Sequence, residues 1–408
     1  NIFIFAINDC YEWKFLKKVI YRFKLNEVPK YKELEKYYRV QNKILSRTMD
    51  GNKPNNKLAH GFARYISNMA TSYFIGKPIK YETEDEEYKE LLSKELKNNY
   101  IHKINYDVSK EASKKGIGFY LLFLDEGGNI RIKKYDAEEI IPIYSPNLGE
   151  FLEGCIRIWE ERDIDGVLIA EYAALYDKEN ITTYKRTSSA GTYQAVDIER
   201  HMFSDIPVIV VWNNEEMAGD YETIIPLINA YDKAQSDTGN DMDYFSDAYL
   251  CIVGASELVE GSGTGEGEED NKKAADLRKD KLLYLDEKGQ AYWLTKNVND
   301  AAGENYKDRI YKDIFFLSQV PALSDESFAG NLTGVAIKYK LIGLEELAIM
   351  KQNSFEAAQK KLVKLVTEYI NLRYNKNFDP EIVKQKYERN FIDNEAEMIK
   401  KARNLDNI

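Results

Sequence analysis

The chain has 408 residues, a formal net charge of −11 and a pI of about 5.2, and 44% of its residues are hydrophobic. This length predicts two or more domains, and the apolar content predicts a buried core. The acidic balance argues against a protein that binds nucleic acid over a broad basic face, but it is compatible with a channel that must not hold nucleic acid. Three widely separated cysteines, Cys10, Cys155 and Cys251, argue against a disulfide framework and favour a reducing compartment.

Neither a membrane anchor nor a metal site is predicted. No window approaches eighteen uncharged apolar residues, and the N-terminal NIFIFAINDC lacks a basic leader, so we expect a soluble protein made in the cytoplasm. The chain does not begin with Met and stops abruptly, so we expect further residues beyond both ends. His60, His102 and His201 have no Cys or His at ligand spacing, so no metal or other cofactor is expected.

The first part of the chain is predicted to be helical. Residues 12–45 read as two surface helices separated near Val28-Pro29. Asn55 and Asn56 are predicted to cap a core helix that runs from Lys57 to Ile75. The acidic residues 82–87 read as a loop and the start of a helix, and a further helix is predicted over 105–113.

The middle third is predicted to be an antiparallel, β-rich domain with helices packed on it, hence of the α+β class. A hairpin signal joins 119–124 to 130–132 through the turn residues 125–129. Further strands are predicted at 140–144, 155–159, 168–176, 181–184, 192–196 and 206–212. Gly116-Ile117-Gly118 could suggest a phosphate loop, but no Gly-Lys-Ser/Thr follows, and a turn is the favoured interpretation.

Beyond Gly219 the pattern changes to helix, from about Tyr221 to Ala248. Its second half, residues 232–241, is polar all round, which suits a segment that lies against copies of itself. A strand at 249–254, a Gly- and Glu-rich tip at 257–271, a short helix at 272–280 and a β-hairpin at 282–294 are then predicted. Together they form a small α/β module between two helices.

The second of these helices is predicted from Val298 to Gln319 and ends before Pro321. A polar loop, SDESFAGNLTG, separates it from a very long helix that starts at Val335 and continues to about Tyr374, on the order of 60 Å. The C-terminal part is predicted as an extended segment at 378–389 and a charged helix at 393–404. No nucleophile with a base, carboxylate pair or ligand cluster can be defended, so an enzyme such as a glycosidase is the weaker hypothesis.

A specific resemblance lies in this loop and the helix after it. Residues 321–331, PALSDESFAGN, followed by 334–341, GVAIKYKL, resemble the tunnel loop and long helix of bacteriophage portal proteins of long-tailed phages and prophages of Gram-positive bacteria. Gly76-Lys77-Pro78 matches a further element of that family, and the likeness extends over about residues 50 to 370. It implies a head-to-tail connector rather than an enzyme.

The resemblance also implies a domain plan. It assigns 1–220 to an α+β wing, 221–248 and 298–319 to the two stem helices, and 249–297 to an α/β clip. The tunnel loop would be 320–334, the long wing helix 335–375, and 376–408 a C-terminal wing segment with the start of a truncated crown. Such a protein forms a ring, usually a dodecamer, at one capsid vertex of the virion, assembled in the host bacterial cytoplasm, for DNA packaging and ejection.

The implied partners are other copies of the chain, the major capsid protein, scaffolding protein, the terminase large subunit, a head-completion adaptor or neck protein, and double-stranded DNA held without sequence preference. No membrane partner is implied. The alternative is a static structural ring, or a baseplate or scaffold component, that does not pass DNA.

Candidate site residues follow from the same resemblance. Lys338 and Lys340 are assigned either to DNA phosphates or to salt bridges with a neighbouring subunit. Phe328 is expected to pack the base of the tunnel loop rather than to stack on bases. The tunnel-loop residues are Ser324, Asp325, Glu326, Ser327, Phe328 and Asn331, and the clip-tip residues for terminase or adaptor docking are Glu257, Glu260, Glu266, Glu268, Glu269 and Asp270.

Overall fold

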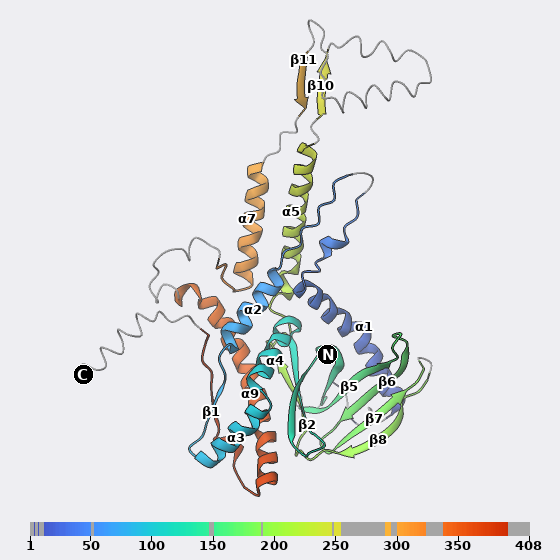
Figure 1. Cartoon of the computed structure of the whole chain (residues 1–408), viewed down its shortest axis with the longest axis vertical. Helices are drawn as coiled ribbons and strands as arrows, with labels where there is room; N and C mark the ends of the chain where they lie inside the picture. The colour runs from blue at the N-terminus through green and yellow to red at the C-terminus, as the bar shows by residue number, and fades with distance from the viewer. Residues whose placement is uncertain are drawn as a thin grey trace, which may run out of the picture. The chain divides into compact units, whose positions relative to one another are not determined.

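The structure is a computed structural model of the chain. It describes residues 4, 7, 12–49, 53–146, 151–188, 191–246, 249–253, 290–294, 300–323 and 338–390. The chain divides into two compact units. Unit 1 comprises Asn1–Asn42, Ala59–Asn229 and Tyr311–Ile408, and unit 2 comprises Lys43–Leu58 and Ala230–Ile310. Antiparallel sheets and long helices occur together, which confirms the predicted α+β class (Figure 1).

The larger sheet of unit 1 has five antiparallel strands in the order β4-β5-β6-β7-β8. Successive strands pair with their sequence neighbours, so Ile156 of β5 lies opposite Ile141 of β4 and Leu175 of β6. Helix α1 (Trp13–Tyr38) contributes Leu16 and Phe23 to the same core. The strands are β4 (Ile140–Tyr144), β5 (Leu152–Arg162), β6 (Leu168–Tyr176), β7 (Asn180–Arg186) and β8 (Gln194–Arg200).

Helix α1 corrects the first expectation, because it is one helix of 26 residues with Pro29 inside it, where two surface helices were predicted. Proline in a helix interior costs about 3 kcal/mol. Phe23 and Tyr31, on either side of Pro29, are both buried in one core, with ring centroids 6.3 Å apart. Burial on both sides of the proline therefore keeps the helix continuous.

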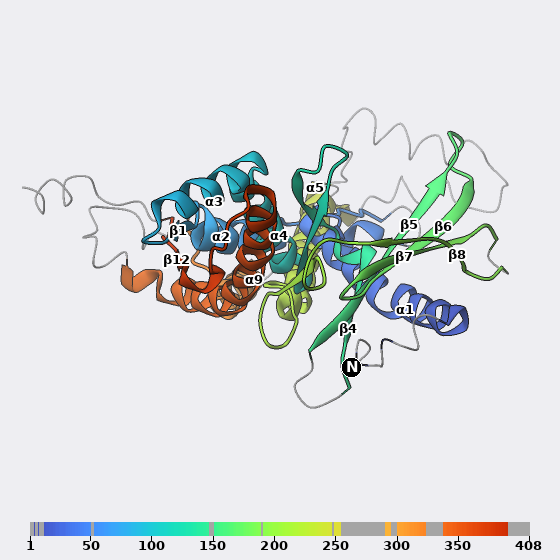
Figure 2. The ribbon, with the colours of Figure 1, turned by 90° about the horizontal axis from the view of Figure 1, so that it is seen from below.

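A second core of unit 1 joins four helices to the three-stranded sheet β3-β2-β9. Phe74 of α2 packs edge-to-face on Phe355 of α9, with centroids 5.5 Å apart, and Tyr120 of β2 lies beside them. The elements are α2 (Phe62–Ile75), α3 (Glu86–Asn98), α4 (Ile101–Lys115), β2 (Ile117–Leu124), β3 (Ile130–Tyr135), β9 (Val208–Trp212) and α9 (Ile342–Tyr374). Figure 2 shows α3, α2, α4 and α9 gathered together within unit 1, to one side of its five-stranded sheet.

The predicted β2–β3 hairpin is confirmed, with Leu122 opposite Ile132. The turn at Gly116 is confirmed as well, because Gly116 ends α4 with φ of +83°, a left-handed conformation that favours glycine. Strand β9 lies on the other side of β2, about ninety residues further along the chain (Ile117 opposite Trp212). Short strands β1 (Lys80–Glu82) and β12 (Lys384–Lys386) also pair, and the 3-10 turn Pro380–Ile382 precedes β12 within the segment predicted to be extended.

The start of α2 is a second correction. Gly61, not Asn55 or Asn56, is the N-cap residue, and no side chain caps the helix. The helix therefore begins at Phe62 and not at Lys57. The Asn55 side chain instead accepts a hydrogen bond from Arg47, and the Asn56 side chain donates one to Asn240.

Unit 2 holds most of helix α5 (Ile225–Ser246), the N-terminal part of α7 (Asp300–Leu317) and the antiparallel ribbon of β10 (Tyr249–Val253) and β11 (Gln290–Leu294). A 3-10 turn, Glu222–Ile224, precedes α5. The strand at the end of the predicted 282–294 hairpin is confirmed, and it pairs with β10. The other arm of that hairpin and the predicted helices 272–280 and 393–404 lie outside the described residues.

Several helices and strands begin or end at other residues than predicted. The strand predicted at 192–196 is β8, shifted to Gln194–Arg200, and the helix predicted at 105–113 is longer at both ends. The long helix α9 begins at Ile342, after a turn at Leu341, so its 33 residues span about 50 Å. Residues 338–340 form a separate helical turn, and 335–337 lie outside the described residues.

Candidate functional site

The polar half of α5 has one buried stripe. Asp232, Ser236 and Asn240 follow one another at a spacing of four residues, so they share one face of the helix. They are 0%, 0% and 5% exposed, although each carries a polar side chain. Buried polar groups need partners. The Ser236 hydroxyl donates to the Asp232 carbonyl at 2.7 Å, and Ser236 and Asn240 have further partners in another part of unit 2.

These partners lie in residues 43–58, which we call the strap. The backbone N–H of Leu58 donates to Ser236 Oγ at 2.9 Å, and that of Asn56 donates to Asn240 Oδ1 at 2.7 Å. Gly239 lies under this contact, because a Cβ there would come within 3.3 Å of Asn56. The strap therefore runs close against α5, and a glycine in the helix gives it room.

Arg47 fixes the strap through three hydrogen bonds. Its guanidinium donates to Asp237 Oδ1 at 2.6 Å, to Asn55 Oδ1 at 3.2 Å and to the Asn56 carbonyl at 2.8 Å. The planar guanidinium suits such forked contacts better than the single ammonium of lysine. The strap thus covers one face of the polar segment with the segment's own chain. The expectation that this segment lies against copies of itself stays a prediction for its other faces.

Arg47→Ala should loosen the strap. It removes the ion pair with Asp237 and two further hydrogen bonds, together worth on the order of 2 kcal/mol, so local opening should become about 30-fold more frequent. Hydrogen exchange at the amides of Asn56 and Leu58 measures this. Lys43→Ala, at an exposed strap position, is the matched control. Unchanged exchange in Arg47→Ala would show that the strap does not depend on the guanidinium.

Helix α7 meets α5 within unit 2 through Lys307. This lysine is 5% exposed, and its ammonium donates to Thr238 Oγ1 at 3.3 Å and to the Glu304 carboxylate. The preceding residues Ala301 to Tyr306 are exposed. The described part of α7 in unit 2 thus has a single buried side and a wide solvent-facing one.

Helix α9 is anchored by a buried ion pair in unit 1. The Lys351 ammonium lies 2.8 Å from the Asp220 carboxylate and also donates to Asn213 Oδ1. The side chains of Lys351 and Asp220 are 3% and 1% exposed. Burial lowers the pKa of Lys351 below its usual value, and the Asp220 carboxylate opposes this shift. Asp220 also accepts hydrogen bonds from Ser113 and Asn213, so its charge has several donors.

The sequence prediction missed this ion pair, although a signal was present. Leu344, Ala348, Lys351 and Phe355 follow the helical core spacing, and all four are buried. A lysine within an apolar stripe indicates a buried partner, because an unpaired buried ammonium is very unfavourable. The sequence does not say which of its 68 acidic residues is the partner.

The predicted tunnel-loop residues 324–331 and clip-tip residues 257–270 lie outside the described residues. Lys338 and Lys340 are described in the helical turn before α9, where Lys338 is exposed and Lys340 is half-buried. Their two interpretations, phosphate contact or inter-subunit salt bridge, stay predictions.

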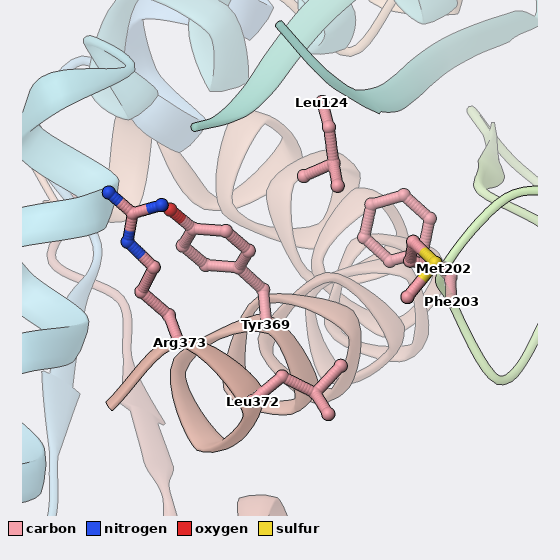
Figure 3. Close-up of a pocket in the computed structure, with 6 residues that line it drawn as sticks. All are labelled: Leu124, Met202, Phe203, Tyr369, Leu372 and Arg373. Atoms are coloured by element: carbon pink, nitrogen blue, oxygen red, sulfur yellow. The ribbon is translucent and has the colours of Figure 1, made fainter. Parts of the chain in front are cut away.

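A cavity of about 190 Å³ opens beside the C-terminal end of α9 in unit 1 (Figure 3). Tyr369, Leu372 and Arg373 come from α9, Leu124 ends β2, and Met202 and Phe203 come from the segment after β8. Figure 3 shows Arg373 beside Tyr369 on one side, with Leu124, Met202 and Phe203 on the other. We call this cavity the α9 pocket.

The described residues offer little reactive chemistry. Among them, no group of three or more His, Cys, Asp or Glu side chains could hold a metal ion. Burial raises the pKa of the Cys155 thiol to about 12, so it is not a reactive thiolate. None of the described helices is both long enough and apolar enough to cross a bilayer.

The order of elements agrees with the resemblance: an α+β body, then α5, the β10–β11 ribbon, α7 and the long helix α9. A family model described as "Phage portal protein, SPP1 Gp6-like" matches residues 17–408, so the chain belongs to this family. The resemblance stated from the sequence is thereby confirmed.

Two portal proteins are among its relatives. That of Bacillus phage SPP1 is 24% identical over 366 residues, which cover 86% of this chain and 70% of that protein. That of Clostridium phage phiCD119 is 23% identical over 393 residues, which cover 90% of this chain and 83% of that protein.

Proposed function

We propose that this chain is the portal subunit of a bacteriophage or prophage. Copies would form a ring at one capsid vertex, through which the terminase packages the genome and through which DNA is later ejected, and to which the neck and tail attach. The observation that carries the proposal is the family match over residues 17–408, together with relatives that are portal proteins of two phages. The role is structural, and no catalytic step is assigned to the chain.

The proposal gives each segment a task. The α+β body up to residue 220 serves as the wing, α5 and α7 as the stem, 249–297 as the clip, and 320–334 as the tunnel loop. Residues 335–375 form the long wing helix, and 376–408 the C-terminal wing segment and the start of a truncated crown. The strap supports this plan because it braces the polar face of α5 within one subunit.

The charge of the chain supports a conduit for DNA. Each Lys or Arg that contacts a phosphate displaces counterions and adds an adhesive step to translocation. A chain with a net charge of −11, and with Asp325 and Glu326 next to small residues in the proposed tunnel loop, should touch duplex DNA without holding it. Lys338 or Lys340 would then modulate the contact or pair with an adjacent subunit.

Reversing two charges of the loop tests the proposal. Asp325→Lys combined with Glu326→Lys should leave rings intact in electron micrographs but slow DNA packaging, because the added ammonium groups bind phosphates. Asp325→Asn with Glu326→Gln is the control that removes charge without adding adhesion, and it should package faster than the lysine variant.

One result would contradict the proposed conduit, and another the role of the loop charges. Rings whose central opening is too narrow for duplex DNA would favour the static structural ring. Packaging at the normal rate by the lysine variant would remove residues 325 and 326 from the mechanism.

A further inference from the structure

The turn between β5 and β6, residues 163–167, presents an apolar side chain to solvent. Ile164 is fully exposed, and Val167 is 61% exposed. The turn is nevertheless well fixed. The N–H of Val167 donates to the Asp163 carboxylate at 2.7 Å, Arg162 donates to the Gly166 carbonyl at 2.8 Å, and Gly166 adopts φ of +80°. A fixed turn that projects an isoleucine loses little conformational entropy when it binds.

The α9 pocket is a hollow, whereas the β5–β6 turn is a projection. Phe203 and Tyr369 are each 8% exposed and form its floor, while the exposed side chains of Leu124, Met202 and Leu372 surround it. An exposed apolar hollow is a common feature of protein interaction sites.

The charges around the two features are complementary. Asp163 and Asp165 flank Ile164, and Asp165 is exposed. Arg373 is exposed at the edge of the α9 pocket, and Lys94 and Arg131 line the adjoining cavity of about 350 Å³. Glu95, which also lines this cavity, accepts from the Tyr374 hydroxyl at 3.0 Å, and the nearby Glu368 accepts from the N–H of Ser204 at 3.1 Å. Lys94 donates to the Tyr374 hydroxyl at 3.3 Å and Arg131 lies 2.8 Å from Asp125, so Arg373 is the cation best placed for an incoming carboxylate.

Both features belong to unit 1, and in both views the β5–β6 hairpin and α9 lie on different sides of that unit (Figures 1 and 2). One copy therefore does not fill its own pocket. Contact between two different patches of identical chains is heterologous, and repetition of such a contact generates a ring when its rotation closes.

We propose that Ile164 of one copy inserts into the α9 pocket of the next copy, with Asp165 facing Arg373. This contact would be a wing-to-wing interface between neighbouring subunits, and it rests on the ring of the proposed function. It uses two surfaces that the fold of a single chain leaves exposed.

Ile164→Asp should weaken assembly without affecting the fold, because the side chain is fully exposed in the single chain. Loss of one buried isoleucine per contact should raise the protein concentration at which half of the chains are assembled by about 10- to 100-fold. Mass photometry of a dilution series measures this. Ile198→Asp, at a 67% exposed position of β8, is the matched control and should assemble as the wild type does.

Charge exchange tests the polar part of the contact. Asp165→Arg and Arg373→Asp should each weaken assembly, and the double variant should recover it, because the pair is restored with its signs exchanged. Failure of the double variant to assemble better than both single variants would overturn the pairing.

Cross-linking tests whether the contact joins two copies. A chain that carries Ile164→Cys and Leu372→Cys should give a ladder of covalent oligomers with a short bismaleimide. A mixture of the two single variants should give covalent dimers, and either single variant alone should resemble the wild type. Rings that form normally but give neither ladder nor dimers would overturn this interface and leave the proposed function standing, whereas a wild-type chain that forms no ring would contradict the proposed function itself.

Discussion

Lys351→Met should lower the free energy of unfolding by about 3–5 kcal/mol, the typical effect of removing one partner from a buried ion pair. The substitution keeps the length of the side chain but leaves the Asp220 carboxylate, 1% exposed, without its cation. The hydrogen bonds from Ser113 and Asn213 to Asp220 remain, but they do not neutralise its charge. Urea unfolding of the full chain, followed by circular dichroism, measures the change.

Two further variants show whether the pair itself is responsible. Lys364→Met, at an exposed position of α9, should leave the urea midpoint nearly unchanged. Lys351→Met combined with Asp220→Asn should be more stable than Lys351→Met alone, because the orphaned charge is removed as well. A midpoint of Lys351→Met equal to that of the wild type would show that α9 does not depend on this anchor.

Glu111→Gln should have the second largest effect. Glu111 is 2% exposed, and its carboxylate lies 2.6 Å from the ammonium of Lys115, 3.1 Å from that of Lys114 and 3.3 Å from that of Lys134. Burial alone raises the pKa of this carboxyl, but the three ammonium groups outweigh burial and lower the pKa to about 2. The shift from 4.5 corresponds to on the order of 3 kcal/mol of stability at neutral pH.

The sign of this shift sets the pH dependence. Because the pKa is lower in the folded chain than in the unfolded one, the carboxylate stabilises the fold fully above about pH 4.5, and this contribution is lost as the pH falls toward 2. The difference in stability between wild type and Glu111→Gln should therefore fall to less than about half at pH 3.

Denaturant titrations at pH 7 and pH 3 test the effect, with Glu126→Gln at an exposed position as the control. A difference between wild type and Glu111→Gln that is equal at both pH values would contradict the assignment of the effect to the Glu111 carboxylate.

Local patterns predicted many elements correctly. The hairpin at 119–132 has adjacent strands and a short turn between them, and Gly116 marks the end of a helix. The repeat of apolar residues along α9 predicts a long helix whatever it packs against. The portal resemblance depends on contiguous residues in the same way, so the sequence by itself identified the family and, through it, the general role.

The tertiary structure alone decided where distant segments meet. Pro29 predicts a break, and only burial of Phe23 and Tyr31 in one core shows why α1 continues. Asn55 and Asn56 both suit a helix N-terminus, and only the fold shows that Asn56 bonds to Asn240 of α5 and Asn55 to Arg47 of the strap.

Lys351 and Asp220 are 131 residues apart in the sequence. The chain contains many other distant pairs of a lysine and an acidic residue, and the sequence does not distinguish this pair from them. Such contacts depend on the long-range fold and on the free energy of burying particular surfaces together. Short-range propensities carry no information about that free energy. The sequence by itself therefore determined the helices and strands and the family. Only the tertiary fold determined which charged side chains are buried together and which surfaces stay exposed.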